Sequence, residues 1–199
     1  MSPIDTLRAE VREHGIQIPD DTWTELASRL APATFKKKAT LISQTEVCEH
    51  VYYVTGGILA SEYVVDDKSI ISRFFRKGNF CTNLISAYKR TLAYDNIIAL
   101  TDVEVVAMPY RWIMDQYLNG ADFGRFIRMK FLGNLIEAKN FITIKTFSDT
   151  EMKYRFLLDE YPDVVQDVPN KHLAAFLGIT PEGLSRFLNG RRKKLNPGQ

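Results

Sequence analysis

The sequence predicts an α+β protein: an antiparallel β-roll, then a long helix, then a C-terminal helix-turn-helix. Three observations support this prediction. Apolar residues alternate with period two between about residues 35 and 108, an apolar stripe at helical spacing runs through 122–147, and two short helical segments meet across a glycine within 170–189. The 199 residues, 45% of them hydrophobic, are sufficient for one or two domains with their own cores.

The N-terminal part predicts two short helices followed by strands. Residues 4–30 have helical spacing interrupted by Gly15 and Pro19, whereas six later segments have strand periodicity. Gly56-Gly57 and Asp66-Asp67-Lys68 separate successive segments and are typical of hairpin turns. A roll of about eight strands would bury their inner faces and edges. The six segments are 39–43, 51–55, 58–65, 69–75, 96–100 and 103–108.

A long amphipathic helix is expected over 122–147, after a shorter one at 110–118. Its roughly 26 residues would span about 39 Å, which is longer than one small domain requires. The alternative is a helix that packs only on its own roll. We expect packing on the roll and also on the same helix of a second copy, through Ile127, Phe131, Leu135, Ala138 and Ile142.

Residues 170–189, NKHLAAFLGITPEGLSRFLN, predict the helix-turn-helix. Ala174 permits close approach of the second helix, and Gly178 can adopt the positive φ that ends the first. Thr180 is a suitable N-cap, with Pro181 at the first helical position. The alternative is an ordinary helical hairpin with a solvated face.

The second helix of this motif presents residue types suited to base edges. Arginine can bond guanine O6 and N7, and glutamate can accept from cytosine N4, so Glu182, Ser185 and Arg186 are the candidate base contacts. Residues 170–199 contain six basic side chains and one acidic one, a charge of +5 in a chain whose total is only +2. Such concentration of charge indicates phosphate binding. The candidate contacts to the DNA backbone are Lys171, Thr180, Asn189, Arg191, Arg192, Lys193 and Lys194.

Other classes of protein are disfavoured. The sequence has no apolar run of about 18 residues and no signal-peptide pattern at its start, so we expect a cytoplasmic protein that does not contact membranes. Its two cysteines and three histidines have no metal-ligand spacing, and we expect no metal and no cofactor. The strands contain no His/His/carboxylate set and no nucleophile paired with a base, which disfavours an enzyme.

Several segments together resemble the Crp/Fnr family of bacterial transcription regulators over essentially the whole chain. They include VYYVTGGILASEY at 51–63, KGNF at 77–80, IIALTDVEVVAMPYRWI at 97–113, and LGITPEGLSR at 177–186. The stretch 154–186 looks most like short members of this family from Bacteroidetes-type bacteria. The resemblance implies a fold like that of cyclic nucleotide-binding domains, with residues 1–120 as a sensory β-roll, 121–148 as a dimerisation helix and 150–199 as a DNA-binding domain.

The resemblance also implies a mechanism. A homodimer would bind double-stranded DNA and reorient its two recognition helices when a small-molecule effector occupies the roll; RNA polymerase is a further partner to consider. Glu182 and Arg186 occupy the positions of the family's base contacts. Pro181 replaces an arginine often found just before them, so the operator sequence is expected to differ.

The expected effector site departs from the family pattern. Members that bind cyclic AMP hold the ribose with a glutamate and the phosphate with an Arg-Ser pair; here Asn83 and Ala93-Tyr94 occupy those positions. Because the charged partner of the phosphate is missing, we expect no binding of cyclic AMP. The candidate effector pocket is Gly78, Asn83, Lys89, Arg90 and Tyr94. No cysteine precedes Cys48, which disfavours an iron-sulfur sensor.

Two further points are left open by the sequence. Only nine residues follow Gly190, so the β-hairpin wing usual in this family is absent or truncated. A signalling module that binds a cyclic nucleotide or other small ligand and acts through a protein partner is the alternative function.

Overall fold

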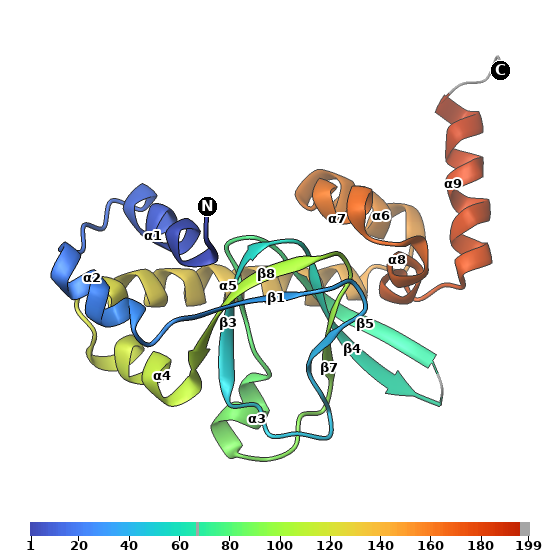
Figure 1. The fold of residues 1–199 in the computed structure, drawn as a ribbon. Helices are drawn as coiled ribbons and strands as arrows, with labels where there is room; N and C mark the ends of the chain where they lie inside the picture. The colour runs from blue at the N-terminus through green and yellow to red at the C-terminus, as the bar shows by residue number, and fades with distance from the viewer. Residues whose placement is uncertain (67, 196–199) are drawn as a thin grey trace.

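The computed structural model describes residues 1–66 and 68–195, with side chains described up to Arg191. Its centre is a β-roll of two four-stranded antiparallel sheets, with strand orders β1-β8-β3-β6 and β2-β7-β4-β5 (Figure 1). The strands are β1 (Ala31–Phe35), β2 (Thr40–Ile42), β3 (His50–Gly56), β4 (Leu59–Val65), β5 (Lys68–Phe75), β6 (Phe80–Cys81), β7 (Asn96–Ala99) and β8 (Val103–Pro109).

Helices flank the roll at both ends, and one long helix joins the two groups (Figure 1). The first group is α1 (Pro3–Glu13), α2 (Asp20–Ala27) and α4 (Tyr110–Asn119); α3 (Leu84–Lys89) lies in the connection between β6 and β7. The long helix is α5 (Asp122–Thr146). The second group is α6 (Thr150–Glu160), α7 (Pro162–Asp167), α8 (Asn170–Leu177) and α9 (Pro181–Leu195).

The predicted fold class is confirmed, but two strands were missed. β1 has the sequence APATF, and Pro32 weakens its strand pattern; the structure tolerates this proline because β1 is an edge strand that pairs only with β8. β6 contains two residues, which is too short for a period-two pattern to be recognised.

The prediction of a hairpin at Gly56-Gly57 was wrong. β3 pairs with β8 and β6, whereas β4 pairs with β5 and β7, so this connection passes from one sheet to the other. It lies against the connection from β7 to β8, where the Ile58 amide donates to Thr101 Oγ1 over 2.9 Å. The hairpin predicted at 66–68 is present, with Val65 paired to Lys68.

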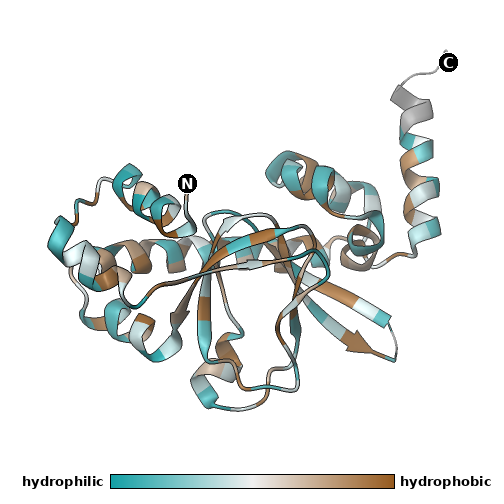
Figure 2. Cartoon of the chain, viewed as in Figure 1, coloured by the Kyte–Doolittle hydropathy of each residue, from teal (hydrophilic) through white to brown (hydrophobic). Residues whose placement is uncertain are grey.

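Two hydrophobic cores hold the molecule together, and α5 contributes to both. Phe126 and Ile127, each 0% exposed, pack in the core formed by the roll and the N-terminal helices. Phe141 and Ile144 pack in a second core with Phe176 and the other C-terminal helices. Figure 2 shows hydrophobic segments along the strands and also on the β4–β5 hairpin, whose tip exposes Val64 and Val65 among others. Helix α5 therefore joins the roll to the C-terminal helices, and β5 adds a direct contact, because Phe74 also packs against Phe176 in the second core.

Gly57→Ala is expected to destabilise the fold more than Gly15→Ala. Both glycines have positive φ, +79° and +71°, but a Cβ at Gly57 would collide with the Asp102 carbonyl oxygen, whereas a Cβ at Gly15 meets no atom within 4 Å. We expect a loss of about 1–2 kcal/mol for Gly15→Ala and about 3 kcal/mol or more for Gly57→Ala, measured by urea unfolding. Equal losses of unfolding free energy for the two variants would contradict the close packing of the β3–β4 connection against the β7–β8 connection.

Candidate nucleic-acid interface

The helix-turn-helix geometry predicted from the sequence is present. Gly178 has φ +76° and ends α8, and the Ile179 amide donates to the Ala174 carbonyl over 3.1 Å. Thr180 Oγ1 then accepts from the Gly183 amide over 3.0 Å, which caps the start of α9. Ala174 is 0% exposed, so its small side chain allows the close packing that joins the two helices.

Helix α9 has one packed face and one free face. Leu184 is fully buried, Phe187 and Leu188 are partly buried, and the Phe187 ring lies 5.3 Å from that of Tyr154 on α6. The helix projects away from the rest of the molecule (Figure 1). Its exposed face therefore carries the predicted base contacts and one predicted backbone contact, namely Glu182, Ser185, Arg186 and Asn189.

The basic residues expected at the DNA backbone have different surroundings. Lys171 is exposed at the start of α8, and Thr180 is exposed while its hydroxyl serves as the helix cap. Arg191 instead pairs with Glu151 on α6, and its guanidinium lies 5.2 Å from the Tyr154 ring centre, so it fastens α9 to α6. The side chains of Arg192, Lys193 and Lys194 lie outside those described, although the backbone continues α9 to Leu195. The backbone of the expected basic tail, through Lys194, is therefore an extension of α9.

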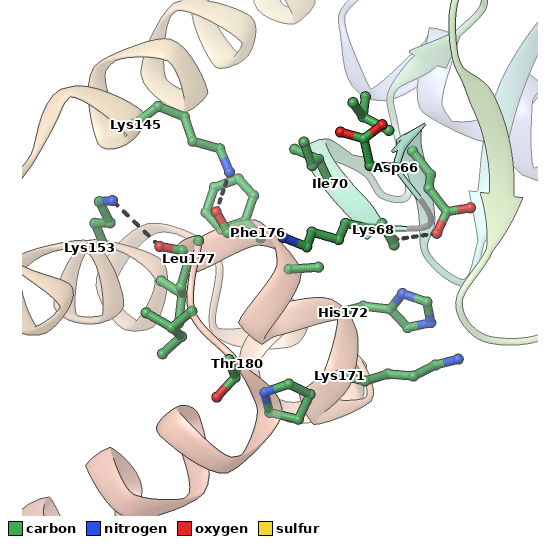
Figure 3. Close-up of a pocket in the computed structure, with 17 residues that line it drawn as sticks. Asp66, Lys68, Ile70, Lys145, Lys153, Lys171, His172, Phe176, Leu177 and Thr180 are labelled. Atoms are coloured by element: carbon green, nitrogen blue, oxygen red, sulfur yellow. Dashed lines mark hydrogen bonds between the residues drawn. The ribbon is translucent and has the colours of Figure 1, made fainter.

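The base of this motif rests against the β4–β5 hairpin, where a pocket of about 930 Å³ lies between hairpin and α8 (Figure 3). Lys145 at the end of α5 donates to the Ile71 carbonyl over 2.9 Å and to the Phe176 carbonyl. Lys153 donates to the Leu177 carbonyl over 3.4 Å. Two ammonium groups thus meet the negative end of the α8 dipole. Burial, together with the nearby charge of Lys153, lowers the pKa of Lys145 to about 8.

The residues expected on the dimer face of α5 lie on two different faces. Ile127 is 0% exposed in the roll core, and Phe131 and Ala138 are partly buried, so part of the predicted set packs within the chain. Leu135 and Ile142 are 67% and 65% exposed. Because the apolar stripe is wide, the spacing of its residues alone could not distinguish the face that packs within the chain from the face that is exposed. The exposed apolar face of α5 consists of Met129, Leu132, Leu135, Ile136 and Ile142.

The candidate effector residues have different surroundings, and their joint role in binding an effector stays a prediction. Gly78, at φ +88°, lies under the ion pair between Glu10 and Lys130, whose charged atoms are 2.7 Å apart. Lys89 and Tyr94 are exposed. Arg90 turns to Glu49 over 2.6 Å. The reason is local: these side chains belong to the surface of α3 and its flanking turns.

Asn83 lies inside the roll, but its side chain is occupied. Its Oδ1 accepts from the Ser86 amide over 3.0 Å, capping α3, and its Nδ2 donates to Asp95. Asp95, 7% exposed, also accepts from Ser61, whose hydroxyl lies 2.7 Å from that of Ser72. Burial raises the pKa of Asp95, and the hydrogen bonds from Ser61 and Asn83 only partly oppose this. A carboxyl group in this position is unfavourable for an anionic cyclic phosphate.

Sequence reasoning missed three charged residues beside the roll. Arg73 on β5 shares a face with the buried Phe75, and its side chain is only 18% exposed. It lies 3.8 Å from Glu137 on α5, and Glu137 lies 3.6 Å from Arg76. The available signal was an arginine at an inward position of the alternating segment SIISRFF.

Next to Arg73 the structure contains a pocket of about 390 Å³ between the roll and α5. Its walls come from β5, β6 and the start of α3 on one side, and from α4 and α5 on the other. None of the five residues predicted for the effector pocket lines it. Among the described residues, no group of His, Cys, Asp and Glu side chains could hold a metal ion. No described helix is long and apolar enough to cross a membrane.

Asp95 is expected to make stability depend on pH. Its pKa is higher in the folded protein than its ordinary value of 3.8, so its contribution to stability is complete below about pH 4 and is lost as the pH rises through the native pKa. The free energy of unfolding of the wild type should therefore fall with rising pH relative to that of Asp95→Asn. Urea unfolding of both proteins from about pH 4 to pH 7 tests this sign. Parallel curves would contradict the burial of an ionisable carboxyl group here.

Comparison with known proteins supports the fold. Residues 32–117 match the cyclic nucleotide-binding domain family. No curated protein matches the sequence. Among solved structures, FixK2 from Bradyrhizobium japonicum aligns with a TM-score of 0.67 at 17% identity, covering 83% of this chain and 85% of FixK2.

Two other solved structures give the same result. The c-di-GMP responsive global regulator CLP from Xanthomonas campestris aligns with a TM-score of 0.66 at 14% identity, over 88% of this chain and 93% of CLP. A CRP-family transcriptional regulator from Thermus thermophilus aligns with a TM-score of 0.63 at 13% identity, over 81% of this chain and 85% of that one. Residues 32–117 thus match the cyclic nucleotide-binding domain in sequence, and the chain has the fold of CRP-type regulators.

Proposed function

We propose that this protein is a homodimeric, sequence-specific DNA-binding transcription regulator. The observation that carries the proposal is the free polar face of α9, where Glu182, Ser185 and Arg186 are exposed on a helix that projects from the body (Figure 1). An α-helix fits the major groove, and these residue types can bond base edges there. The likeness of the fold to CRP-type regulators supports the same function.

Binding to the DNA backbone completes the interface. Lys171, Thr180 and Asn189 are exposed on the two helices of the motif, and α9 continues into Arg192, Lys193 and Lys194. We propose that these groups contact phosphates. Arg191 is left out of this set because it pairs with Glu151.

The dimer is proposed to form through the exposed apolar face of α5. Five large apolar side chains there are between 38% and 67% exposed in the single chain. A second copy packed along this face would cover them, and a two-fold dimer would present two recognition helices about one DNA turn apart. Residues 1–120 would then be the sensory part, 121–148 the dimer helix and 150–199 the DNA-binding part.

The sensory part is proposed to respond to a small molecule other than cyclic AMP. Asp95 occupies the roll interior beside Asn83, and the family's Arg-Ser pair is replaced by Ala93-Tyr94. We expect no catalytic activity, a cytoplasmic location and RNA polymerase as a further partner. Membership in the short Bacteroidetes-type subgroup stays a prediction.

Selection from random duplexes tests the function directly. The full chain is expected to enrich a two-fold symmetric sequence, and DNase footprinting should protect it at physiological salt. Enrichment of no sequence above non-specific binding would overturn the proposal. Protection of a single, unsymmetric half-site would retain DNA binding but contradict the dimer.

Arg186→Ala is expected to remove discrimination at one base pair in each half-site. Loss of a bidentate contact with guanine should weaken binding of the selected duplex by about 1–3 kcal/mol, but leave duplexes changed at that pair almost unaffected. Fluorescence anisotropy with a set of single-position duplexes measures this. The control is Arg29→Ala, an exposed arginine outside the motif. A uniform loss over all duplexes would make Arg186 a phosphate contact.

Ile136→Glu combined with Ile142→Glu is expected to separate the dimer without unfolding the chain. These side chains are 56% and 65% exposed in the single chain, so only the dimer would bury the new charges. The dissociation constant should rise by about 100-fold or more. Sedimentation equilibrium measures it, with Leu118→Glu, 69% exposed on α4, as the control. If the wild type stays monomeric at 100 times the protein concentration used in the DNA-binding experiments, the proposed interface is refuted.

A further inference from the structure

Arg73 is a buried arginine whose hydrogen bonds are incomplete. Its Nε and Nη2 are inaccessible to solvent and have no hydrogen-bond acceptor. The nearest carboxylate oxygen, Glu137 Oε2, lies 3.8 Å from Nη2 and is itself without a hydrogen-bond donor. The guanidinium stacks over the Phe75 ring, 4.5 Å from its centre. A buried charge in this state is costly unless another group completes its bonds.

The 390 Å³ pocket between the roll and α5 borders this arginine. Phe75, Phe80 and Phe131 supply much of its apolar wall, and Arg73 and Arg128 are its charged groups; none of the described residues that line it is acidic. Arg128 Nη1 already donates to the Tyr117 carbonyl over 2.7 Å and to the Gly120 carbonyl over 3.3 Å. Arg73 is therefore the cation at the wall with unmet donors.

We propose that this pocket binds a small organic carboxylate with an aromatic or branched apolar body, and that Arg73 receives the carboxylate group. The volume lies toward the lower end of the range for small-molecule sites, and the apolar wall suits a body without hydroxyl groups. A guanidinium matches a carboxylate with two parallel hydrogen bonds. A cyclic nucleotide would bring ribose hydroxyls, but two of the neutral polar side chains at the wall are already engaged, since Thr82 donates to the His50 carbonyl and Asn134 to the Phe80 carbonyl. Its role as effector rests on the proposed regulator function, but its binding does not.

A chain of ion pairs connects Arg73 to the C-terminal helices. Glu137 faces Arg73 through Oε2 and Arg76 through Oε1, and Arg76 Nη1 donates to Asp163 on α7 over 3.0 Å. The Arg76 guanidinium also lies 4.6 Å from the centre of the Tyr161 ring. A carboxylate that draws Arg73 away from Glu137 leaves Glu137 to Arg76 alone. The ion pair between Arg76 and Asp163 of α7 then changes in strength when a ligand occupies the pocket.

Isothermal titration calorimetry of the full chain tests the binding. The probes are 2-naphthoate, benzoate and 4-methylpentanoate, each with its uncharged amide, and cyclic AMP. At least one carboxylate is expected to bind with a dissociation constant below about 1 mM. Its amide should bind at least tenfold more weakly, because it lacks the charge that pairs with Arg73.

Matched variants locate the site. Arg73→Met should weaken the carboxylate at least tenfold and leave the amide unchanged, and Arg73→Lys should recover part of the loss. Arg90→Met is the control, since Arg90 pairs with Glu49 outside the pocket. If Arg73→Met fails to fold, Ala138→Phe fills the pocket while retaining Arg73, and should also abolish binding.

The outcomes separate this inference from the proposed function. Absence of binding by every carboxylate, equal binding of acid and amide, or tighter binding of cyclic AMP would overturn the assignment of the pocket. Carboxylate binding that changes the affinity for the selected duplex by threefold or more would support its role as effector. DNA binding without carboxylate binding would refute only the ligand; carboxylate binding without DNA binding would refute only the regulator.

Discussion

The buried face of α5 is the constraint on which the rest of the structure depends. Phe123, Phe126 and Ile127 fill the roll core near its start, and Phe141 and Ile144 fill the second core near its end. A helix of 25 residues extends about 37 Å, so a single stiff element crosses from one core to the other. Helix α8 also packs directly on β5 of the roll, where the ring centres of Phe74 and Phe176 lie 5.0 Å apart. The position of α9 relative to the roll is therefore set by how α5 packs at both ends and by this contact between α8 and β5.

Charged side chains on α5 also fix which of its surfaces faces each neighbouring element. Lys130 pairs with Glu10 near the first core, Glu137 faces two arginines near the middle, and Lys145 bonds carbonyls of β5 and α8 at the end. Half-buried pairs gain little net stability because desolvation offsets their attraction. Their value lies in specifying which surfaces meet. The middle contact includes Arg73, which borders the proposed ligand pocket, so a ligand bound there would alter the arrangement.

Much of the fold was predictable because its signals are local. The change from period two to helical spacing, the cap at Thr180 and the positive φ of Gly178 each depend on neighbouring residues in sequence. What failed depends on distant residues. Gly56-Gly57 resembles a hairpin turn until its contact with Thr101 and Asp102 is known, and the wide stripe of α5 divides into two faces only once the roll covers one of them. The same holds for the candidate sites. The exposed polar face of α9 could be predicted from the helical spacing of its residues, whereas the pocket beside Arg73 is formed by elements that are distant in the sequence.

Placing a cleaving reagent on the recognition helix tests the central claim that α9 lies in the major groove. Cys48 and Cys81 are both buried, so Ser185→Cys would supply the one exposed thiol among the described residues for attachment of an iron chelate. Hydroxyl-radical cleavage of the selected duplex should then occur in two clusters about 10 base pairs apart, each centred in a major groove. Uniform weak cleavage, or clusters centred in the minor groove, would contradict the account.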